Sequence, residues 1–119
     1  MITHVVLFKP RGDVTDADRR AFVEAIVRAR REIPGIRRFH LGRRVLRDVS
    51  YAEAMPQDFS FAAVIEFDDL AAVRAYLQHP AHDPMGSWFW KVSEASLVYD
   101  YEMTDAAGAA ELFERATTP

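Results

Sequence analysis

The sequence predicts an α+β domain whose strands and helices follow the order β-α-β-β-α-β. A chain of 119 residues has the size of a single domain. Half of its residues are hydrophobic, which is enough to bury a core and excludes a disordered chain. Short segments with the patterns of strands are interrupted by two segments with helical spacing of apolar residues. These three observations together predict the fold class.

The first strand and the first helix carry the clearest signals. Residues 2–9, ITHVVLFK, are β-branched and apolar on both faces, which predicts a strand covered on both sides. Pro10 ends this strand, and Thr15 then caps a helix with Asp18 in the position of a capping-box acid. Pro34 and Gly35 end the helix. Its apolar stripe consists of Phe22, Ile26, Ala29 and Ile33.

The next two strands form a pair around a loop. Residues 36–46 contain two Arg-Arg pairs, which predicts an exposed or edge strand. Residues 47–57 are predicted to form a loop. Residues 59–67 alternate between apolar and smaller or polar side chains, so they predict a strand with one buried face.

The last third contains a helix, an aromatic segment, a strand and a tail. An aspartate caps a helix over about residues 70–79, which Pro80 ends. The segment MGSWFWKVSEA is predicted to be helical in its latter part, and residues 95–103 are predicted to form the fourth strand. Residues 1–103 therefore make up the domain, and residues 104–119 a tail with a short helix.

This order corresponds to the ferredoxin-like arrangement, a four-stranded antiparallel sheet with both helices on one face. The other face of the sheet is then uncovered. Since the strands carry apolar residues on both faces, that face would expose too large an apolar patch for a monomer. A second copy of the same sheet is the simplest cover. The sequence therefore predicts a homodimer.

Composition narrows the classes of partner. The chain has no cysteine, which excludes disulfides and cysteine-ligated zinc and favours a cytoplasmic location. No apolar run is long enough to span a membrane, and no signal-peptide pattern opens the chain. Basic residues concentrate in residues 11–47 and acidic ones in residues 48–119. We interpret this asymmetry as attraction within the fold or across a dimer rather than as nucleic-acid binding.

Four segments resemble the stress-responsive α/β-barrel family, a branch of the dimeric α/β-barrel proteins. They are ITHVVLFK at the start, IPGI at 33–36, VIEFDDLAAVRAYLQHPAH at 64–82 and VYDYEM at 98–103. The resemblance implies a dimer in which two sheets close into a barrel and each monomer holds a largely apolar pocket. The catalytic relatives that it implies are plant polyketide cyclases, which use a tyrosine and a histidine, assisted by a histidine of the first strand.

Carried over by position, the catalytic tyrosine corresponds to Tyr76, the histidine to His82 and the strand histidine to His4. A further pocket tyrosine of the cyclases is replaced by Ile26, so the pocket and substrate are expected to differ. A tyrosine and a neutral histidine suit proton abstraction beside a carbonyl group. The expected pocket-lining residues are Ile26, Val6, Phe8, Trp88 and Phe89.

Other roles stay open for these side chains. Tyr76 suits a core position with its hydroxyl at the surface, and His82 suits a cap after Pro80. His4 suits a structural histidine bonded to backbone or a carboxylate. His79 is interpreted as a helix-end residue near unpaired carbonyl groups. A metal site of three histidines and Asp83 is disfavoured because Pro80 interrupts the helical spacing between His79 and His82.

The sequence thus predicts a homodimer that binds a small apolar or aromatic molecule, with acid–base chemistry of a cyclase or lyase type on a carbonyl compound. The alternative is a non-catalytic stress-response or structural dimer, whose pocket would be filled by side chains such as Phe61, Phe67 and Trp88. Haem binding, as in other members of the wider superfamily, is a weaker alternative. No cofactor and no metal are predicted.

Overall fold

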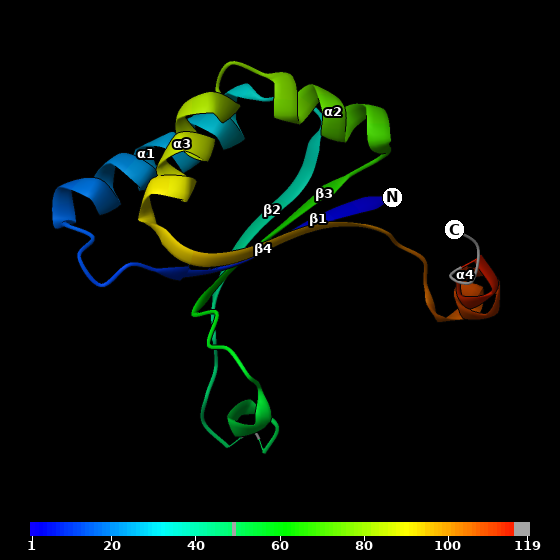
Figure 1. Ribbon diagram of the computed structural model, residues 1–119. Helices are drawn as coiled ribbons and strands as arrows, with labels where there is room; N and C mark the ends of the chain where they lie inside the picture. The colour runs from blue at the N-terminus through cyan, green and yellow to red at the C-terminus, as the bar shows by residue number, and fades with distance from the viewer. Residues whose placement is uncertain (49, 116–119) are drawn as a thin grey trace.

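A computed structural model describes residues 1–48 and 50–115. Figure 1 shows one antiparallel sheet with three helices on one side of it and a fourth, C-terminal helix at a distance. The order of strands across the sheet is β2-β3-β1-β4. The elements are β1 (Ile2–Pro10), α1 (Asp16–Glu32), β2 (Ile36–Arg43), η1 (Ala52–Ala54), β3 (Phe61–Phe67), α2 (Leu70–Gln78), α3 (His82–Val92), β4 (Ser93–Glu102), η2 (Ala106–Gly108) and α4 (Ala109–Arg115).

The predicted fold class is confirmed, and so is the start of the first helix. The Thr15 hydroxyl accepts a hydrogen bond from the backbone N–H of Asp18 at 3.1 Å, and the Asp18 carboxylate accepts one from the N–H of Thr15 at 3.3 Å. This reciprocal pair is the capping box that the spacing predicts. α1 then runs to Glu32, and Ile33 ends it in an extended conformation directly before Pro34.

One element differs from the expectation. The aromatic segment was predicted to be helical in its latter part, but α3 covers His82–Val92 and the strand β4 begins at once with Ser93. Pro84 is compatible with the first turn of α3 because the first N–H groups of a helix have no intrahelical partner. The helix therefore begins closer to Pro80 than the sequence pattern indicated, and it ends earlier.

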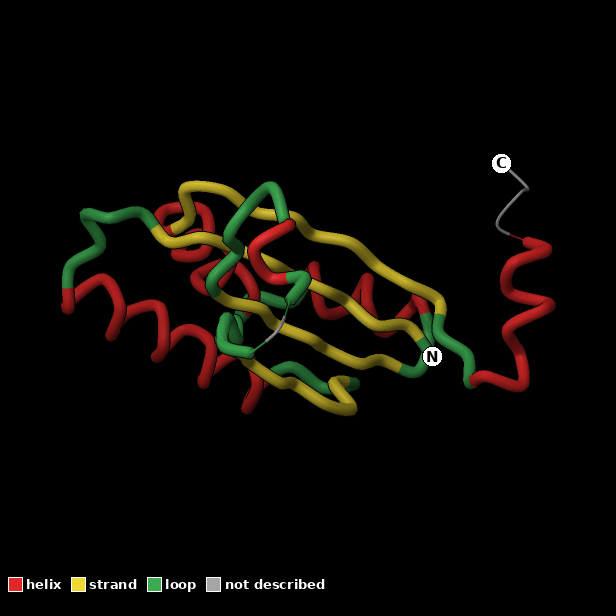
Figure 2. Tube along the Cα trace, turned by 90° about the horizontal axis from the view of Figure 1, so that it is seen from below, coloured by secondary structure: helices red, strands yellow, loops and turns green. Residues whose placement is uncertain are grey.

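The sheet has a covered face and an uncovered one, as Figures 1 and 2 show from two directions. In β1 the covered face carries His4, Val6 and Phe8, all of which line a cavity beneath the helices. The intervening Val5 and Leu7 point to the opposite side. Their register partners extend that apolar surface across the sheet: Val64 and Ala62 on β3, and Tyr99 and Leu97 on β4.

The buried residues form two clusters rather than one continuous core. The larger joins the C-terminal half of α1 to the ends of β2 and β3 and to α2 and α3, with Phe67, Val73 and Tyr76 almost fully buried. The smaller consists of Val6, Phe8 and Ala63, packed against Phe22 and Phe89. Residues of both clusters line the same cavity.

None of the helices within residues 1–48 and 50–115 is both long and apolar enough to cross a membrane.

Candidate functional site

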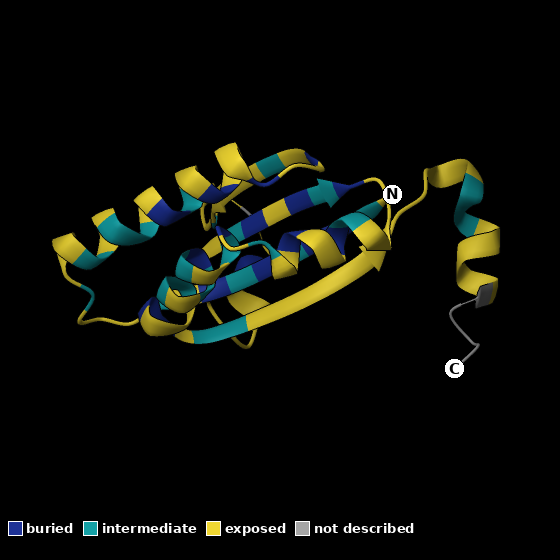
Figure 3. Cartoon of the chain, turned by 90° about the horizontal axis from the view of Figure 1, so that it is seen from above, coloured by how far each residue is buried: buried dark blue, intermediate teal, exposed yellow. Residues whose placement is uncertain are grey.

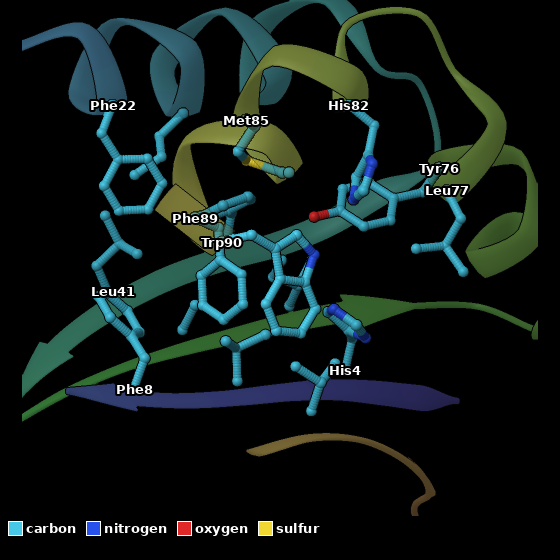
Figure 4. Close-up of a pocket in the computed structure, with 17 residues that line it drawn as sticks. His4, Phe8, Phe22, Leu41, Tyr76, Leu77, His82, Met85, Phe89 and Trp90 are labelled. Carbon is cyan, nitrogen blue, oxygen red and sulfur yellow. The ribbon is translucent and has the colours of Figure 1, made fainter. Parts of the chain in front are cut away.

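A cavity of about 230 Å³ lies between the sheet and the helices. All four strands and α1, α2 and α3 contribute to its wall. Among the side chains that line it, three can take part in proton transfer: His4, Tyr76 and His82. Figure 4 shows these three at one end of the cavity, with Phe8, Phe22 and Leu41 at the other. An apolar chamber with a few polar groups gathered at one place is the usual form of a small-molecule site.

His4 is oriented by a carboxylate on the neighbouring strand. It is buried on β1, and its Nδ1 lies 2.6 Å from Oδ1 of Asp100. The antiparallel register places these two residues directly opposite each other on β1 and β4. Nδ1 beside a carboxylate carries the hydrogen and donates it, so in the neutral ring the lone pair is on Nε2. The carboxylate thereby fixes both the tautomer and the orientation of the ring.

Tyr76 occupies the centre of the group. The helix α2 that carries it begins at Asp69, whose side chain accepts a hydrogen bond from the N–H of Ala72 at 2.9 Å. Val73 and Tyr76 are one helical turn apart and both face the sheet, and Tyr76 is only 1% exposed. Its ring packs against Phe67 with centroids 5.1 Å apart. Burial raises the pKa of the phenol, and the charge of Asp100 adds to the effect.

The two imidazole rings lie on either side of Tyr76. Its ring meets that of His82 edge-on with centroids 4.8 Å apart, and that of His4 at 5.8 Å. Within the described residues the hydroxyl of Tyr76 has no hydrogen-bond partner. Figure 4 shows this oxygen directed toward the side where Met85 and Trp90 lie. The hydroxyl is therefore available to a ligand.

His82 opens α3 and is half-buried. Burial lowers the pKa of this imidazole below its ordinary value of 6.5, and the nearby His4 lowers it further, whereas Asp83 acts in the opposite direction. Gly86, one turn later, leaves room for the ring. A Cβ at position 86 would lie 3.3 Å from Cε1 of His82. His82 is thus a neutral base near pH 7, held at a position that a larger residue at 86 would crowd.

His79 lies outside this group and supports the turn that leads to it. Its Nδ1 accepts a hydrogen bond from the N–H of Ala81 at 3.0 Å, and its carbonyl oxygen accepts one from the N–H of His82 at 2.9 Å. The sequence predicts that the His79 ring lies near unpaired carbonyl groups. In the structure the ring instead accepts a hydrogen bond from an N–H group. The turn between α2 and α3 is consequently fixed by backbone and imidazole together.

Four of the five expected lining residues are at the cavity: Ile26, Val6, Phe8 and Phe89. The fifth, Trp88, packs against the larger core cluster instead, and Trp90 takes the place at the cavity. The helical period explains the exchange. His82, Gly86, Phe89 and Trp90 form one stripe of α3 along the cavity, whereas Trp88 and Val92 lie on another side of the helix, and Met85 between them both lines the cavity and belongs to the core.

Sequence reasoning did not single out Asp100, nor did it connect Gly86 with His82. Asp100 is exposed on one side, and only the pairing of β1 with β4 brings it to His4. The sequence signal for Asp100 is weak, because it is only an acid within the predicted strand 95–103, which begins and ends with apolar residues. Gly86 carries a recognisable signal, since a glycine four residues after a histidine in a helix leaves that ring uncovered.

Within residues 1–48 and 50–115 there is no group of three histidine, aspartate or glutamate side chains that could hold a metal ion. His4, Tyr76 and His82 instead supply proton donors and acceptors. A phenol that stays protonated and an imidazole that stays neutral can polarise a carbonyl oxygen and accept a proton next to it.

Comparisons with known proteins agree with this fold and with the resemblance in the sequence. Olivetolic acid cyclase from Cannabis sativa is 21% identical over 100 residues, which span 84% of this chain and 94% of the cyclase. A crystal structure of a dimeric protein with a ferredoxin-like fold from Bacteroides fragilis superposes with a TM-score of 0.63 at 29% identity, covering 86% of this chain and 95% of that one. Hydroxynitrile lyase from Passiflora edulis superposes with a TM-score of 0.71 at 15% identity, covering 88% and 94% of the two chains.

The description "stress responsive A/B barrel domain" belongs to the family whose sequence pattern matches residues 2–103. This span includes all four strands, the helices α1 to α3 and each of the cavity residues discussed above. The chain therefore belongs to the stress-responsive A/B barrel domain family.

Proposed function

We propose that this protein binds a small apolar or aromatic carbonyl compound in the cavity and transfers protons on it. The observation that carries the proposal is the gathering of His4, Tyr76 and His82 at one end of an otherwise apolar chamber. Tyr76 donates a hydrogen bond to the carbonyl oxygen, and His82 accepts the proton from the adjacent carbon. His4, oriented by Asp100, presents Nε2 next to Tyr76 as a second proton acceptor that assists this pair.

The directions of the two pKa shifts support this division of roles. Burial raises the pKa of Tyr76, which keeps the phenol protonated as a donor. Burial lowers the pKa of His82, which keeps the imidazole free to accept a proton. When environments move two neighbouring groups apart in this way, the pair can act as acid and base at neutral pH. Relatives named as a cyclase and a lyase are in keeping with such chemistry.

The alternative is a stress-response or structural dimer without catalysis. It requires that side chains fill the chamber. The open volume of about 230 Å³ favours the binding of a ligand over this alternative. Phe67 and Trp88, which were expected to fill the space in that case, pack into the larger core cluster instead.

We further propose that the working form is a homodimer joined through the uncovered sheet face. Val5, Val64 and Tyr99 lie next to each other at its centre, in register across three strands. An apolar sheet face of this kind needs a cover. The 29% identical relative from Bacteroides fragilis is described as dimeric with the same fold. The lack of cysteine supports a cytoplasmic setting for this dimer.

Exchange of hydrogen for deuterium next to a carbonyl group tests the chemistry directly. Acetophenone and its 4-alkyl homologues, incubated with the protein in D₂O and followed by NMR, are expected to exchange their methyl hydrogens faster than in buffer. His82→Gln and Tyr76→Phe should each slow the exchange by about 10²-fold or more, since a positioned base or donor contributes roughly that much.

His79→Gln is the matched control, because His79 is close in sequence to His82 and the amide oxygen of glutamine can replace Nδ1 as the acceptor for the N–H of Ala81. It should leave the exchange rate unchanged. Calorimetric titration with the same ketones measures binding separately. Exchange at the rate of the buffer despite binding would contradict the catalytic role, and no binding at all would contradict the ligand site.

A further inference from the structure

The C-terminal arm, defined here as residues 104–115, extends away from the rest of the molecule. Figures 1 and 3 show it beyond the end of β4, separated from both the sheet and the helices. It consists of η2 and the seven-residue α4. It also lies outside residues 2–103, which match the family. The arm is thus an addition of this chain to the family fold.

The arm has the composition of a docking segment. Phe113 is 70% exposed, and Leu112 is also exposed. A helix of seven residues is too short to be stable in water without packing. Large apolar side chains on such a helix therefore indicate that the arm packs against another surface.

A suitable surface lies at the opposite end of the uncovered sheet face. Leu7 and Leu97 of this face, together with Met55, Pro56 and Phe59 of the loop between β2 and β3, line an apolar hollow there. The loop descends on the helix-free side of the sheet (Figure 1). In register, Glu102 at the base of the arm pairs with Ile2, whereas Phe61 beside the hollow pairs with Phe8. Six residues of strand separate the two ends by about 20 Å.

We propose that, in the homodimer, the C-terminal arm of each protomer packs with Phe113 and Leu112 into this hollow of its partner. The inference rests on the proposed dimer through the uncovered face. A two-fold axis perpendicular to the strands reverses the strand direction, so it brings the arm of one copy over the hollow of the other, twice and reciprocally. A two-fold axis along the strands would instead bring arm against arm.

Charge favours the first arrangement. The arm carries Asp105, Glu111 and Glu114 against the single Arg115. Arg43 and Arg44 lie at the hollow. Arg44 is paired with Asp58 at 2.9 Å, and within residues 1–48 and 50–115 Arg43 has no ion-pair partner. An acidic arm next to Arg43 is attractive, whereas two acidic arms side by side repel each other.

The natural absence of cysteine allows a direct test by cross-linking. Phe113→Cys in one chain and Met55→Cys in another, combined by subunit exchange and treated with a short bis-maleimide, should give a covalent species of two chains. Met55 is 52% exposed. Val27→Cys is the matched control for Met55→Cys, because Val27 is 54% exposed but lies on α1, on the helix side. It should not cross-link to position 113.

A second measurement does not depend on the linker. Phe113→Ala in the full chain should weaken the dimer about tenfold in dissociation constant, which corresponds to about 1.4 kcal/mol, as measured by analytical ultracentrifugation. Val27→Ala should leave the constant unchanged. Because Phe113 is on a separate helix, its substitution does not disturb the core, and the melting temperature of the domain serves as the check.

The outcomes of these experiments test the proposed arm contact separately from the proposed dimer on which it depends. A wild-type chain that sediments as a monomer overturns both proposals. If the chain is a dimer but Phe113→Cys does not cross-link to Met55→Cys, or cross-links equally to Val27→Cys, only the proposed contact of the arm is overturned. Cross-linking of Phe113→Cys with itself would overturn it too, since that product requires the arrangement with arm against arm.

Discussion

Burial shifts the pKa values of Tyr76 and His82 in opposite directions. It raises that of the phenol and lowers that of the half-buried imidazole, so each group is kept in its neutral form, the phenol with its proton and the imidazole without a second one. The two rings are in contact, with centroids 4.8 Å apart. A substrate at this point meets a donor and an acceptor that need no change of protonation before the reaction begins.

The pH dependence of stability should reveal the state of His82. Its pKa in the folded protein is below 6.5, so below pH 6.5 the unfolded chain binds a proton that the folded chain does not. Stability should therefore fall as the pH drops from 6.5 toward the folded pKa, and the loss should level off below it. Chemical denaturation of wild type and His82→Gln between pH 7 and 5 measures this difference. Parallel curves for the two proteins would contradict a lowered pKa.

Asp100 should act through His4 rather than on the substrate. Asp100→Asn keeps the size of the side chain but removes the negative charge, and its NH₂ group can donate to Nδ1 and so favour the other tautomer of His4. We expect ketone exchange to slow by at least tenfold with little change in ketone affinity. Glu94→Gln is the control, since Glu94 is on the same strand and pairs with Lys9. An Asp100→Asn protein with full activity would show that the pair is only structural.

Helix α3 combines a structural face with a functional face. Val92 is buried and Trp88 packs against the core, while His82, Gly86 and Trp90 line the cavity and Met85 contributes to both. The helix is therefore fixed on one side and presents its other side to a ligand. At position 86, a residue with a side chain would favour the helix, whereas glycine leaves room for the imidazole of His82.

Gly86→Ala should separate these two demands. Alanine favours a helix interior over glycine by up to about 1 kcal/mol, so the free energy of unfolding should stay equal or increase. The new methyl group would lie 3.3 Å from Cε1 of His82, so ketone exchange should fall because the ring is displaced. Ser87→Ala, at an exposed position of α3, should leave the exchange rate unchanged. Loss of stability with full activity would refute this account.

At the scale of the whole molecule, the uncovered face of the sheet is the surface through which we propose that two copies assemble. Val64 is central on this face, next to Val5 on β1 and His40 on β2. Val64→Glu should convert the dimer into a monomer, because a carboxylate would be buried between two sheets. Val27→Glu introduces the same charge on the exposed side of α1 and should have no effect. Size-exclusion chromatography with light scattering distinguishes the two states, and a dimeric Val64→Glu would place the interface elsewhere.

The sequence was sufficient for the fold because its signals are local. The capping box at Thr15, the Pro34-Gly35 stop and the alternation in residues 61–67 each act within a few residues. The family resemblance led to His4, Tyr76 and His82, which the structure places around one cavity; their catalytic roles stay a prediction. Asp100 could not be found this way, because it meets His4 only through strand pairing across 96 positions.

The start of α3 illustrates a second limit. The sequence predicts that the helix ends before Pro80 and that a turn or short helix can follow, but not that one helix runs from His82 to Val92. That shift changes which tryptophan reaches the cavity, because side chains two positions apart on a helix point in widely different directions. Side-chain assignments within an element are thus less certain than the element itself whenever its start is uncertain.

The two tryptophans of the chain differ in exposure, so their intrinsic fluorescence can report on the binding of a ligand. The indole of Trp90 is 65% exposed at the cavity, whereas that of Trp88 is partly buried, with the ammonium group of Lys91 4.4 Å above its ring. A ligand that enters the cavity displaces water from the indole of Trp90 and leaves the surroundings of Trp88 unchanged. The emission spectrum should then shift toward the blue, with Trp88 as a constant internal reference, so occupancy can be followed without any label.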